Sequence, residues 1–266
     1  MSTHTTPLTV LITGAAGGLG KVIATAFLDT GSNVAICDIN KERLDGTANE
    51  WAKQPQYSDK FLVRYADTTS LSDVQALVDA TTSKFGRLDI LINNAAILDK
   101  FDPAGTLQRE MWDRIIAVNL TGPYICTQVA VNAMQAQEPA GGGIINMGSN
   151  ASISGTDGGM AYTVSKHGLL GMTRNTAAFY LEHGITCSML QLGGLAPTNI
   201  TEAMANGVNE EGLALIDKHM PGFKPGVNDV PLRDVAKFCV FLADREIAKT
   251  MNGACIPFNR NWPAGV

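Results

Sequence analysis

The residues whose types and spacing could do chemistry are a tyrosine, a lysine and a serine. Tyr162 and Lys166 lie four residues apart in the run AYTVSK, and Ser149 precedes the tyrosine by thirteen residues. On a helix, side chains four residues apart share one face, so a phenol and an ammonium would lie close together. The cation would favour the phenolate and bring a phenol pKa of about 10 toward neutrality. This spacing predicts an acid/base group that serves hydride transfer to or from a carbonyl.

Ser149 follows the apolar run at residues 144–147, so we expect it at the end of a strand. Its hydroxyl could donate a hydrogen bond to a substrate oxygen that gains negative charge during reduction. A tyrosine and a lysine at this spacing also form ordinary surface contacts on many helices. The functional interpretation therefore depends on the rest of the chain.

The start of the chain has the pattern of a nucleotide-binding turn. Residues 8–12 are apolar, the run TGAAGGLG follows at 13–20, and a helical pattern covers residues 22–28. A dinucleotide pyrophosphate needs this order of strand, glycine turn and helix start. The glycines let the backbone approach the phosphates, and the helix start attracts their negative charge.

A second strand, residues 33–37, ends at Asp38, eighteen residues beyond Gly20. A carboxylate at this place can accept hydrogen bonds from the adenosine ribose and would repel a 2′-phosphate. We therefore predict NAD as the cofactor, with NADP the less favoured alternative because Lys41 and Arg43 lie nearby. Asp38 could also be an ordinary turn residue at a strand end.

Together these motifs resemble the short-chain dehydrogenase/reductase family, from about residue 8 to about residue 258. The resemblance implies a catalytic set of Asn119, Ser149, Tyr162 and Lys166, in which the asparagine carbonyl holds a water linked to the lysine. Asn150, next to Ser149, is a further candidate for the substrate pocket, so the predicted substrate contacts are Ser149, Asn150 and Tyr162. The implied cofactor contacts are Gly14, Gly18, Leu19, Gly20, Asp38, Ile39, Asp67, Thr68, Asn93, Asn94, Ala95, Tyr162, Lys166, Gly193, Leu195 and Thr198.

The chain departs from the family pattern at three strand ends. After the fourth strand Ala96 stands where the family has Gly, which slightly narrows the space beside the cofactor. Gly148 replaces the first of two serines, which leaves Ser149, the serine assigned to chemistry. After the sixth strand the family usually has Pro-Gly, whereas this chain has QLGGL at 191–195. We expect Gly193 to permit close approach to the nicotinamide, with Leu195 and Thr198 contacting its carboxamide.

The composition excludes several classes of partner. The net charge is −5, charged residues make up 17%, and no basic stripe is present, which argues against nucleic acid or an anionic membrane as partner. The printed chain shows no stretch of about 20 apolar residues and no secretory signal, so we expect a soluble, cytoplasmic protein. The five cysteines have no paired spacing and predict reduced core thiols, with no metal site.

Apolar strand patterns alternate with helical patterns along the chain. Such repeats imply a parallel sheet with helices on both faces, and ligands beyond the carboxyl ends of the strands. We predict an α/β Rossmann-type, doubly wound sheet of about seven strands in a single domain spanning residues 1–266. The predicted strands are 8–12, 33–37, 61–65, 88–93, 144–147, 185–192 and 254–258, and the helical patterns include 71–85, 109–117, 122–136, 160–181 and 232–242.

Residues 198–228 break this alternation. Apolar side chains between Asn206-Gly207 and Pro221-Gly222 predict one or two short helices on flexible joints. In the resembled family this stretch folds over the substrate, which would then be largely apolar. The same side chains could instead simply pack onto the sheet.

The predicted function is reversible hydride transfer between NAD and a secondary alcohol or ketone, with Tyr162 as acid/base. Two alternatives remain open: cyclisation, isomerisation or dehydration on the same scaffold, and a nucleotide-sensing module without turnover. The family resemblance also implies a homo-oligomer, tetramer or dimer, formed through the long helices that start near Gly122 and Met160.

Overall fold

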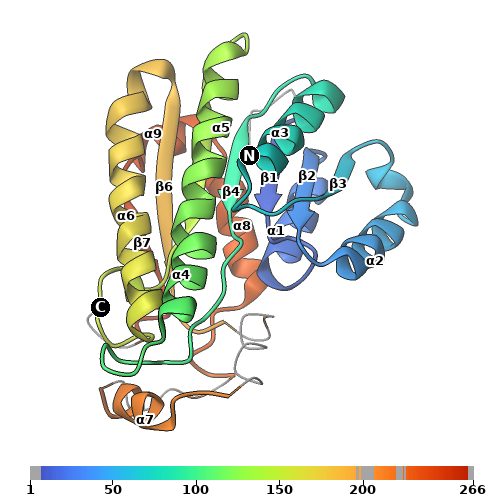
Figure 1. Cartoon of the computed structure of the whole chain (residues 1–266). Helices are drawn as coiled ribbons and strands as arrows, with labels where there is room; N and C mark the ends of the chain where they lie inside the picture. The colour runs from blue at the N-terminus through green and yellow to red at the C-terminus, as the bar shows by residue number, and fades with distance from the viewer. Residues whose placement is uncertain (1–6, 196–197, 199–206, 220–223, 225, 263–266) are drawn as a thin grey trace.

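The computed structural model describes residues 7–195, 198, 207–219, 224 and 226–262. Within these residues seven parallel strands form one sheet in the order β3-β2-β1-β4-β5-β6-β7 (Figure 1). This order is a doubly wound sheet, because the chain moves outward from β1 to β3, returns to β4 and continues to the other edge. The strands are β1 Thr9–Thr13, β2 Asn33–Asp38, β3 Phe61–Tyr65, β4 Ile90–Asn93, β5 Gly142–Met147, β6 Ile185–Leu192 and β7 Cys255–Phe258.

Helices cover both faces of the sheet. One core cluster joins the sheet to α1, α2 and α8, and the other joins it to α3, α5 and α6. Figure 1 shows α5 and α6 in front of the strands and α8 behind them. The helices are α1 Gly18–Asp29, α2 Lys41–Ala52, α3 Leu71–Phe85, α4 Arg109–Ile116, α5 Gly122–Ala136, α6 Met160–Tyr180, α7 Glu210–His219, α8 Leu232–Leu242 and α9 Arg245–Thr250.

The central strands β1, β4, β5 and β6 are buried along their whole length because both of their faces are covered. In β1, Val10 and Ile12 belong to one core cluster, whereas Leu11 between them belongs to the other. Successive side chains of a strand point to opposite faces, so an unbroken apolar run fills both layers. The core therefore fixes which residues end up at the strand ends, where the polar ones lie.

The predicted fold class and the seven predicted strands are confirmed, with strand ends shifted by up to two residues. The sequence analysis did not name α2 or α9, both of which are mostly polar. It also missed a π-helical turn, Ala117–Thr121, that joins α4 to α5. Within the described part of the chain, no helix is long and apolar enough to cross a membrane.

The carboxyl ends of the strands face the lower part of the molecule in Figure 1, where α7 lies apart from the two helix layers. α7 is the described helix of the predicted covering segment 198–228. Residues 199–206, 220–223 and 225 of that segment lie outside the described residues. Asn209 fixes the start of α7, since its backbone N–H donates to the carbonyl of Lys100 at 2.8 Å.

Candidate active site

The structure brings Ser149, Tyr162 and Lys166 together at the carboxyl edge of the sheet. Ser149 follows β5, while the other two lie in the first two turns of α6. The Ser149 hydroxyl lies near enough to the Tyr162 phenol to act on its pKa, and it also accepts the N–H of Ala151 at 3.2 Å. The Lys166 ammonium lies 5.5 Å from the centre of the Tyr162 ring and donates to the Met147 carbonyl at 2.9 Å. Tyr162 is 7% exposed and Lys166 3%, so a phenol and an ammonium share a nearly dry site.

The pKa values in this chain do not show the lowered phenol pKa that the spacing predicts. Burial raises the pKa of Tyr162 to about 12, and the negative charges of Asp99 and Asp157 add to the rise, while the nearby Ser149 hydroxyl opposes it. Burial also lowers the pKa of Lys166 to about 8. Desolvation penalises the charged form of each group, and it outweighs their mutual attraction.

Asn119 lies in the π-helical turn between α4 and α5 and is 1% exposed. Its side-chain oxygen accepts from the Ile97 N–H, and its amide donates to the Ile97 carbonyl, both at 2.8 Å. The amide also lies 3.3 Å from the Ser165 hydroxyl. Asn119 therefore ties the segment after β4 to α6. The water link implied by the resemblance stays a prediction.

The glycine turn after β1 packs closely against the segment after β4, and the helix that follows it starts without a side-chain cap. Gly14 and Gly18 have φ values of +62° and +51°, which side chains rarely adopt. A Cβ on Gly20 would lie 2.6 Å from the Asn94 amide nitrogen. The N-cap of α1, Gly17, carries no side-chain cap, and the first turn contains no acidic residue. The first N–H groups of α1 therefore lack a side-chain cap, as an anion site at a helix start requires.

Asp38 lies beside this turn. Its carboxylate accepts the N–H of Ala16 at 3.2 Å and that of Asn40 at 3.0 Å. Ile39 follows it and is 65% exposed, which leaves an apolar side chain open next to the carboxylate. The arrangement suits a ribose on the carboxylate and an adenine ring on the apolar neighbour.

The other predicted cofactor residues of this half shape the strand ends. Asn94 donates to the carbonyls of Thr13 and Gly14, both at 2.9 Å, and the Ala95 N–H donates to the Thr13 hydroxyl. Asn93 lies deeper, where its amide donates to Asn146 at 2.8 Å and to Thr127 at 3.2 Å.

Asp67 follows β3, and its carboxylate accepts both the backbone N–H and the hydroxyl of Thr69. Thr68 is 7% exposed and packs against Gly122, where a Cβ would lie 2.9 Å from the Thr68 hydroxyl oxygen. The protein thus orders this loop by itself. The predicted adenine contact of Asp67 stays a prediction.

The strand ends on the β6 side look different from the expectation. A Cβ on Gly193 would lie 2.8 Å from the Cα of Asn259, so the backbone that approaches this glycine closely is the protein's own. Leu195 forms an isolated parallel bridge with Val230. Residues 196–197 and 199–206 around Thr198 lie outside the described part, so its nicotinamide contact stays a prediction.

Asn150, predicted to face the substrate, is 3% exposed and holds the end of the chain. Its side-chain oxygen accepts from the amides of Gln191 and Asn259, both at 3.1 Å, and its amide donates to the Trp262 carbonyl at 3.1 Å. These partners lie on β6 and after β7. Asn150, the residue after Ser149, thus joins the end of β5 to β6 and to the segment after β7.

Two carboxylates near Tyr162 were missed by the sequence analysis. Burial raises the pKa of Asp99 and that of Asp157, and both negative charges act on the Tyr162 phenol. Ser154 and Asn150 act against this rise at Asp157, and one oxygen of the Asp157 carboxylate has no hydrogen-bond partner among the described residues. Neither residue belongs to a recognisable spacing, since one follows β4 in a loop and the other lies five residues before Tyr162.

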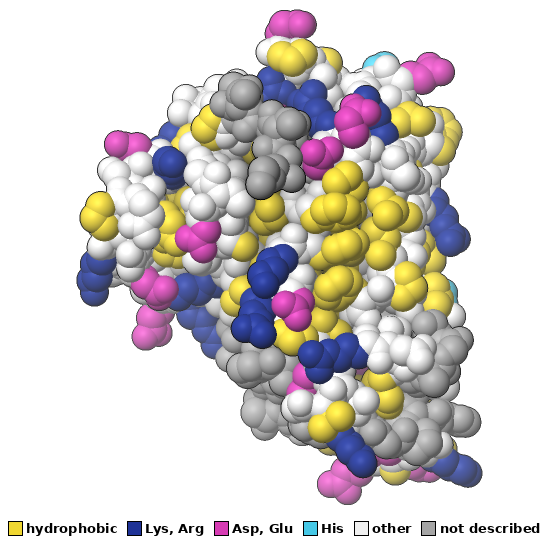
Figure 2. All heavy atoms as spheres, turned by 180° about the vertical axis from the view of Figure 1, so that it is seen from behind, with side chains coloured by type: hydrophobic (Ala, Val, Ile, Leu, Met, Phe, Trp, Pro, Cys, Tyr) yellow, Lys and Arg dark blue, Asp and Glu magenta, His cyan; other side chains and the backbone are white. Residues whose placement is uncertain are grey.

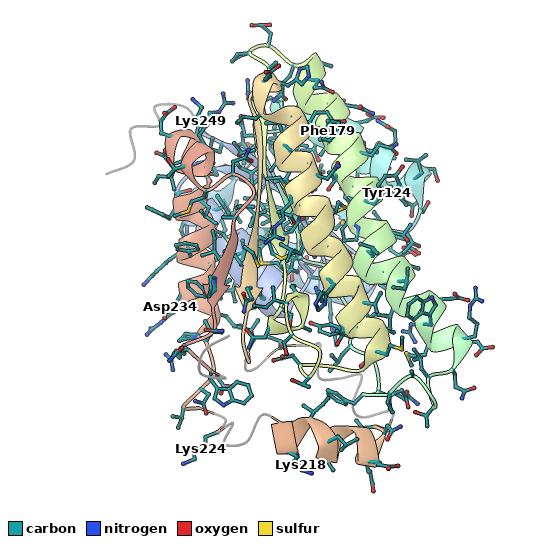
Figure 3. All side chains as sticks on the ribbon, turned by 90° about the vertical axis from the view of Figure 1, so that its left-hand side faces the viewer. Tyr124, Phe179, Lys218, Lys224, Asp234 and Lys249 are labelled. Atoms are coloured by element: carbon teal, nitrogen blue, oxygen red, sulfur yellow. The ribbon has the colours of Figure 1, made fainter. Side chains whose placement is uncertain are left out.

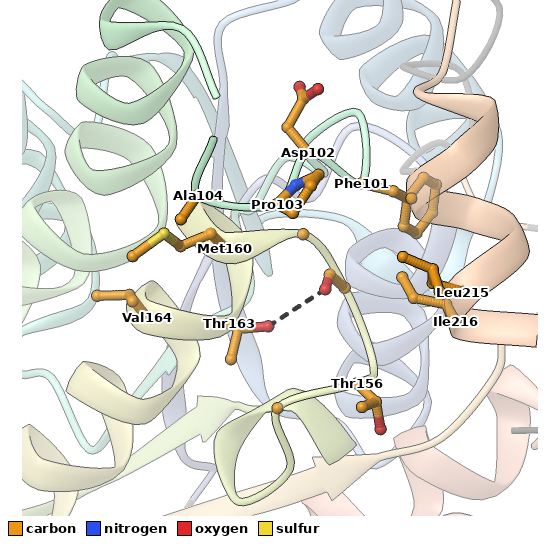
Figure 4. A pocket seen from close by; sticks show the side chains of 14 residues that line it. Phe101, Asp102, Pro103, Ala104, Thr156, Met160, Thr163, Val164, Leu215 and Ile216 are labelled. Atoms are coloured by element: carbon orange, nitrogen blue, oxygen red, sulfur yellow. Dashed lines mark hydrogen bonds between the residues drawn. The ribbon is translucent and has the colours of Figure 1, made fainter. Parts of the chain in front are cut away.

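A cavity of about 290 Å³ lies between α7 and the start of α6. Figure 4 shows Phe101, Leu215 and Ile216 on one side of it and Met160 and Val164 on the other. These side chains are apolar. Ser149, Tyr162 and Lys166 are not among the residues that line this cavity, although Met160 and Thr163 beside Tyr162 are. In the described part of the chain, no group of three His, Cys, Asp or Glu side chains could hold a metal ion.

The chain matches a family model and is similar to several known proteins. A sequence model of the family described as short chain dehydrogenase matches residues 8–209. "Short chain dehydrogenase/reductase dpfgG" of Gibberella zeae is 46% identical over 257 residues, which cover 96% of this chain and 93% of that protein. "3beta-hydroxysteroid dehydrogenase 2" of Eggerthella lenta is 33% identical over 96% of this chain and 95% of that protein. The crystal structure of levodione reductase superposes with a TM-score of 0.83 at 26% identity, covering 99% of this chain and 100% of that one.

Proposed function

Because the chain belongs to the short-chain dehydrogenase/reductase family of oxidoreductases, we propose that it transfers a hydride reversibly between NAD and a secondary alcohol or ketone. The observation that carries this proposal is the buried contact of Ser149, Tyr162 and Lys166 beside the open glycine turn. A nucleotide-sensing module would not need a phenol, a hydroxyl and an ammonium gathered in a dry site, where each costs desolvation.

In this proposal Tyr162 is the acid/base. During oxidation the phenolate takes the hydroxyl proton of the alcohol, and during reduction the phenol returns it to the carbonyl oxygen. Ser149 donates a hydrogen bond to the same oxygen, whose negative charge is greatest in the transition state. Lys166 places a positive charge beside the phenol, which offsets part of the effect of burial on the phenolate.

When bound, the dinucleotide would supply the hydride acceptor or donor. The glycine turn at residues 14–20 would hold the pyrophosphate, and Asp38 the adenosine ribose. One N–H of Lys166 is used on the Met147 carbonyl, which leaves two donors for the nicotinamide ribose. We propose NAD over NADP because the Asp38 carboxylate would repel a 2′-phosphate.

We propose a largely apolar substrate and a single domain in which the 198–228 segment covers it. The cavity beside α7 supports this, because its lining is mostly apolar. The similar proteins support oxidation of an alcohol or reduction of a ketone as the reaction, since one is named for a hydroxysteroid and another for levodione. A 3β-hydroxyl on a steroid is a secondary alcohol on a ring.

We also propose a homo-oligomer, tetramer or dimer, built on α5 and α6. Tyr124 on α5 is 51% exposed and Phe179 on α6 is 71% exposed, and Figure 3 shows both on this helix layer. Figure 2 shows hydrophobic side chains gathered on the opposite side of the molecule as well, and Phe241 of α8 is 48% exposed. Light scattering of Phe179→Asp should report a smaller particle than the unaltered protein if α6 forms the contact.

The proposed activity is tested with a panel of secondary alcohols and ketones of increasing apolar size, each with NAD and with NADP. Reduced nicotinamide is followed by its near-ultraviolet absorbance. Net formation with an apolar ring alcohol and NAD supports the proposal. Conversion of a substrate without net change in the nucleotide would instead indicate cyclisation or isomerisation.

A further inference from the structure

The helix that carries Tyr162 begins without a cap of its own. The N-cap of α6 is Gly159, which has no side chain to accept a hydrogen bond, and the first turn contains no acidic residue. The first N–H groups of any α-helix lack intrahelical partners. Tyr162 is the third helical residue, so its N–H is one of these groups.

Asp99, sixty residues earlier in the chain than Gly159, completes this helix start. Its carboxylate accepts the N–H of Gly159 at 3.0 Å, that of Tyr162 at 2.9 Å and that of Phe101 at 3.1 Å. The fit is close, because a Cβ on Gly159 would lie 2.5 Å from one carboxylate oxygen. With Asp99 in this place, any side chain at position 159 would collide with the carboxylate, so only glycine fits there.

Asp99 is a buried carboxylate held by backbone N–H groups and not by a cation. It is 2% exposed, and among the described residues no lysine or arginine forms an ion pair with it. Burying an unpaired carboxylate is unfavourable unless strong hydrogen bonds replace water. Hydrogen bonds from backbone N–H groups to a carboxylate are of this strong, charge-assisted kind.

The loop that contains Asp99 also reaches α7. The carbonyl of Asp102 accepts the N–H of Met160 at 2.9 Å, and its carboxylate accepts the side-chain amide of Asn209 at 2.8 Å. Asn209 in turn caps α7 through its bond to the Gly212 N–H. One loop thus anchors the start of the catalytic helix and the start of the helix over the cavity.

We propose that Asp99 is a positioning residue of the active site, which holds the backbone of Tyr162 and thereby places the phenol relative to Ser149 and Lys166. The proposal rests on the proposed function of Tyr162. It adds a residue from the loop after β4 to the catalytic apparatus. Asp99 acts through Tyr162 and does not touch the reacting atoms.

The test compares Asp99→Asn, which keeps an oxygen acceptor, with Asp99→Ala, which keeps none. If Asp99 positions the phenol, kcat for the best alcohol falls by about 10- to 100-fold in Asp99→Ala and by less in Asp99→Asn, while NAD affinity changes little. Gly159→Ala should displace the carboxylate and reproduce part of the loss. Equal losses in Asp99→Asn and Asp99→Ala would overturn the proposal, because only charge would then matter.

The matched control is Asp244→Ala. Asp244 caps α9 by accepting the N–H groups of Glu246 and Ile247, on a helix remote from Tyr162. It should lower the melting temperature without changing kcat per folded molecule. If Asp99→Ala does only the same, Asp99 is an ordinary cap and the proposal fails. If Asp99→Ala does not fold, the comparison of Asp99→Asn with Gly159→Ala decides.

Two further readouts separate positioning from structure. The groups that face the phenol are Lys166, Ser149, Asp157 and Asp99, so removing the Asp99 charge should move the alkaline rise of alcohol oxidation to lower pH. Amide hydrogen exchange of Tyr162 should accelerate at least about tenfold in Asp99→Ala. This exchange needs no substrate, so it reports on Asp99 even if no alcohol is oxidised, an outcome that would defeat the proposed function alone. Unchanged exchange would overturn the proposal.

Discussion

Two helices start at the carboxyl edge of the sheet with a glycine as N-cap, and they differ in what meets their first N–H groups. At α1 neither Gly17 nor the first turn offers an acceptor side chain. At α6 the carboxylate of Asp99 accepts the N–H groups of Gly159 and Tyr162. An open start attracts an anion, whereas a filled start holds its own residues in place.

The difference teaches how one local geometry can serve two purposes. α1 leaves its positive end for the phosphates of a ligand, so the residues at its start are mostly glycines, two of which have a positive φ. α6 must hold one phenol at a fixed place, so a carboxylate from another part of the chain neutralises its positive end. The two starts therefore predict opposite responses when an acidic side chain is added or removed.

The largest effect is expected at the phenol that α6 carries. Tyr162→Phe removes the proton donor and acceptor but keeps the ring, so turnover should fall by about 1,000-fold or more while NAD affinity stays nearly intact. Steady-state rates and nucleotide titration measure the two quantities. Near-normal turnover would remove Tyr162 from its role.

Gly17→Asp should give the start of α1 a carboxylate that accepts its first N–H groups, as Asp99 does at the start of α6. Gly17 has a φ of −166°, an extended backbone that any residue adopts, so the carboxylate can cap the helix. Stability should rise by up to about 1 kcal/mol, because a charged cap complements the helix dipole. NAD affinity should fall by about 10- to 100-fold, because the added charge repels the pyrophosphate.

The control for this prediction is Gly17→Ser, which adds a neutral cap. It should stabilise the helix while weakening NAD binding much less than the aspartate does. Isothermal titration and thermal unfolding measure both. Unchanged NAD affinity in Gly17→Asp would mean that the phosphates do not lie at this helix start.

A smaller effect is expected at Asp38, the carboxylate beside the open start. Asp38→Asn removes the negative charge but keeps an oxygen that can accept the Ala16 N–H. The preference for NAD over NADP, measured as the ratio of kcat/KM values, should fall by about tenfold. A ratio that does not move would assign cofactor choice to other residues.

The pH dependence of alcohol oxidation should reflect the pKa values of Tyr162 and Lys166, which lie in the first two turns of α6. The pKa of Tyr162 is raised to about 12 by burial, so the phenolate needed for oxidation gains population as pH rises. The pKa of Lys166 is lowered to about 8, so its ammonium is lost as pH rises through that value. Alcohol oxidation should therefore increase from pH 6 upward by at most about tenfold per unit and then flatten as Lys166 loses its charge, whereas ketone reduction should not increase. A rate of oxidation that falls steadily with pH would contradict the assignment.

The open start of α1 could be predicted from the sequence because it is local. Glycines at fixed intervals after an apolar strand define the turn, and the next strand brings Asp38 to its side. The spacing of Tyr162 and Lys166 is equally local, and the structure places both side chains at one site. The parallel sheet covered on both faces follows from alternating apolar patterns, because each crossover returns over one face.

The filled start of α6 could not be predicted, because its acceptor is distant in the sequence. The residues around Asp99 have no periodic pattern, and its contact depends on how the loop after β4 crosses α6. The direction of the Tyr162 pKa was mispredicted for a related reason. Spacing shows the neighbouring charge of Lys166 but not the burial of the phenol, and burial has the larger effect. Asn150 was likewise interpreted without its partners after β7.

The central claim is that Tyr162 serves a hydride transfer between an alcohol carbon and the nicotinamide. It is tested most directly with the best alcohol of the panel, deuterated at its carbinol carbon, and NAD. The account predicts deuterium in the reduced nicotinamide with the unaltered enzyme and almost none with Tyr162→Phe. Product that forms without deuterated nucleotide, or equal labelling by the variant, would contradict it.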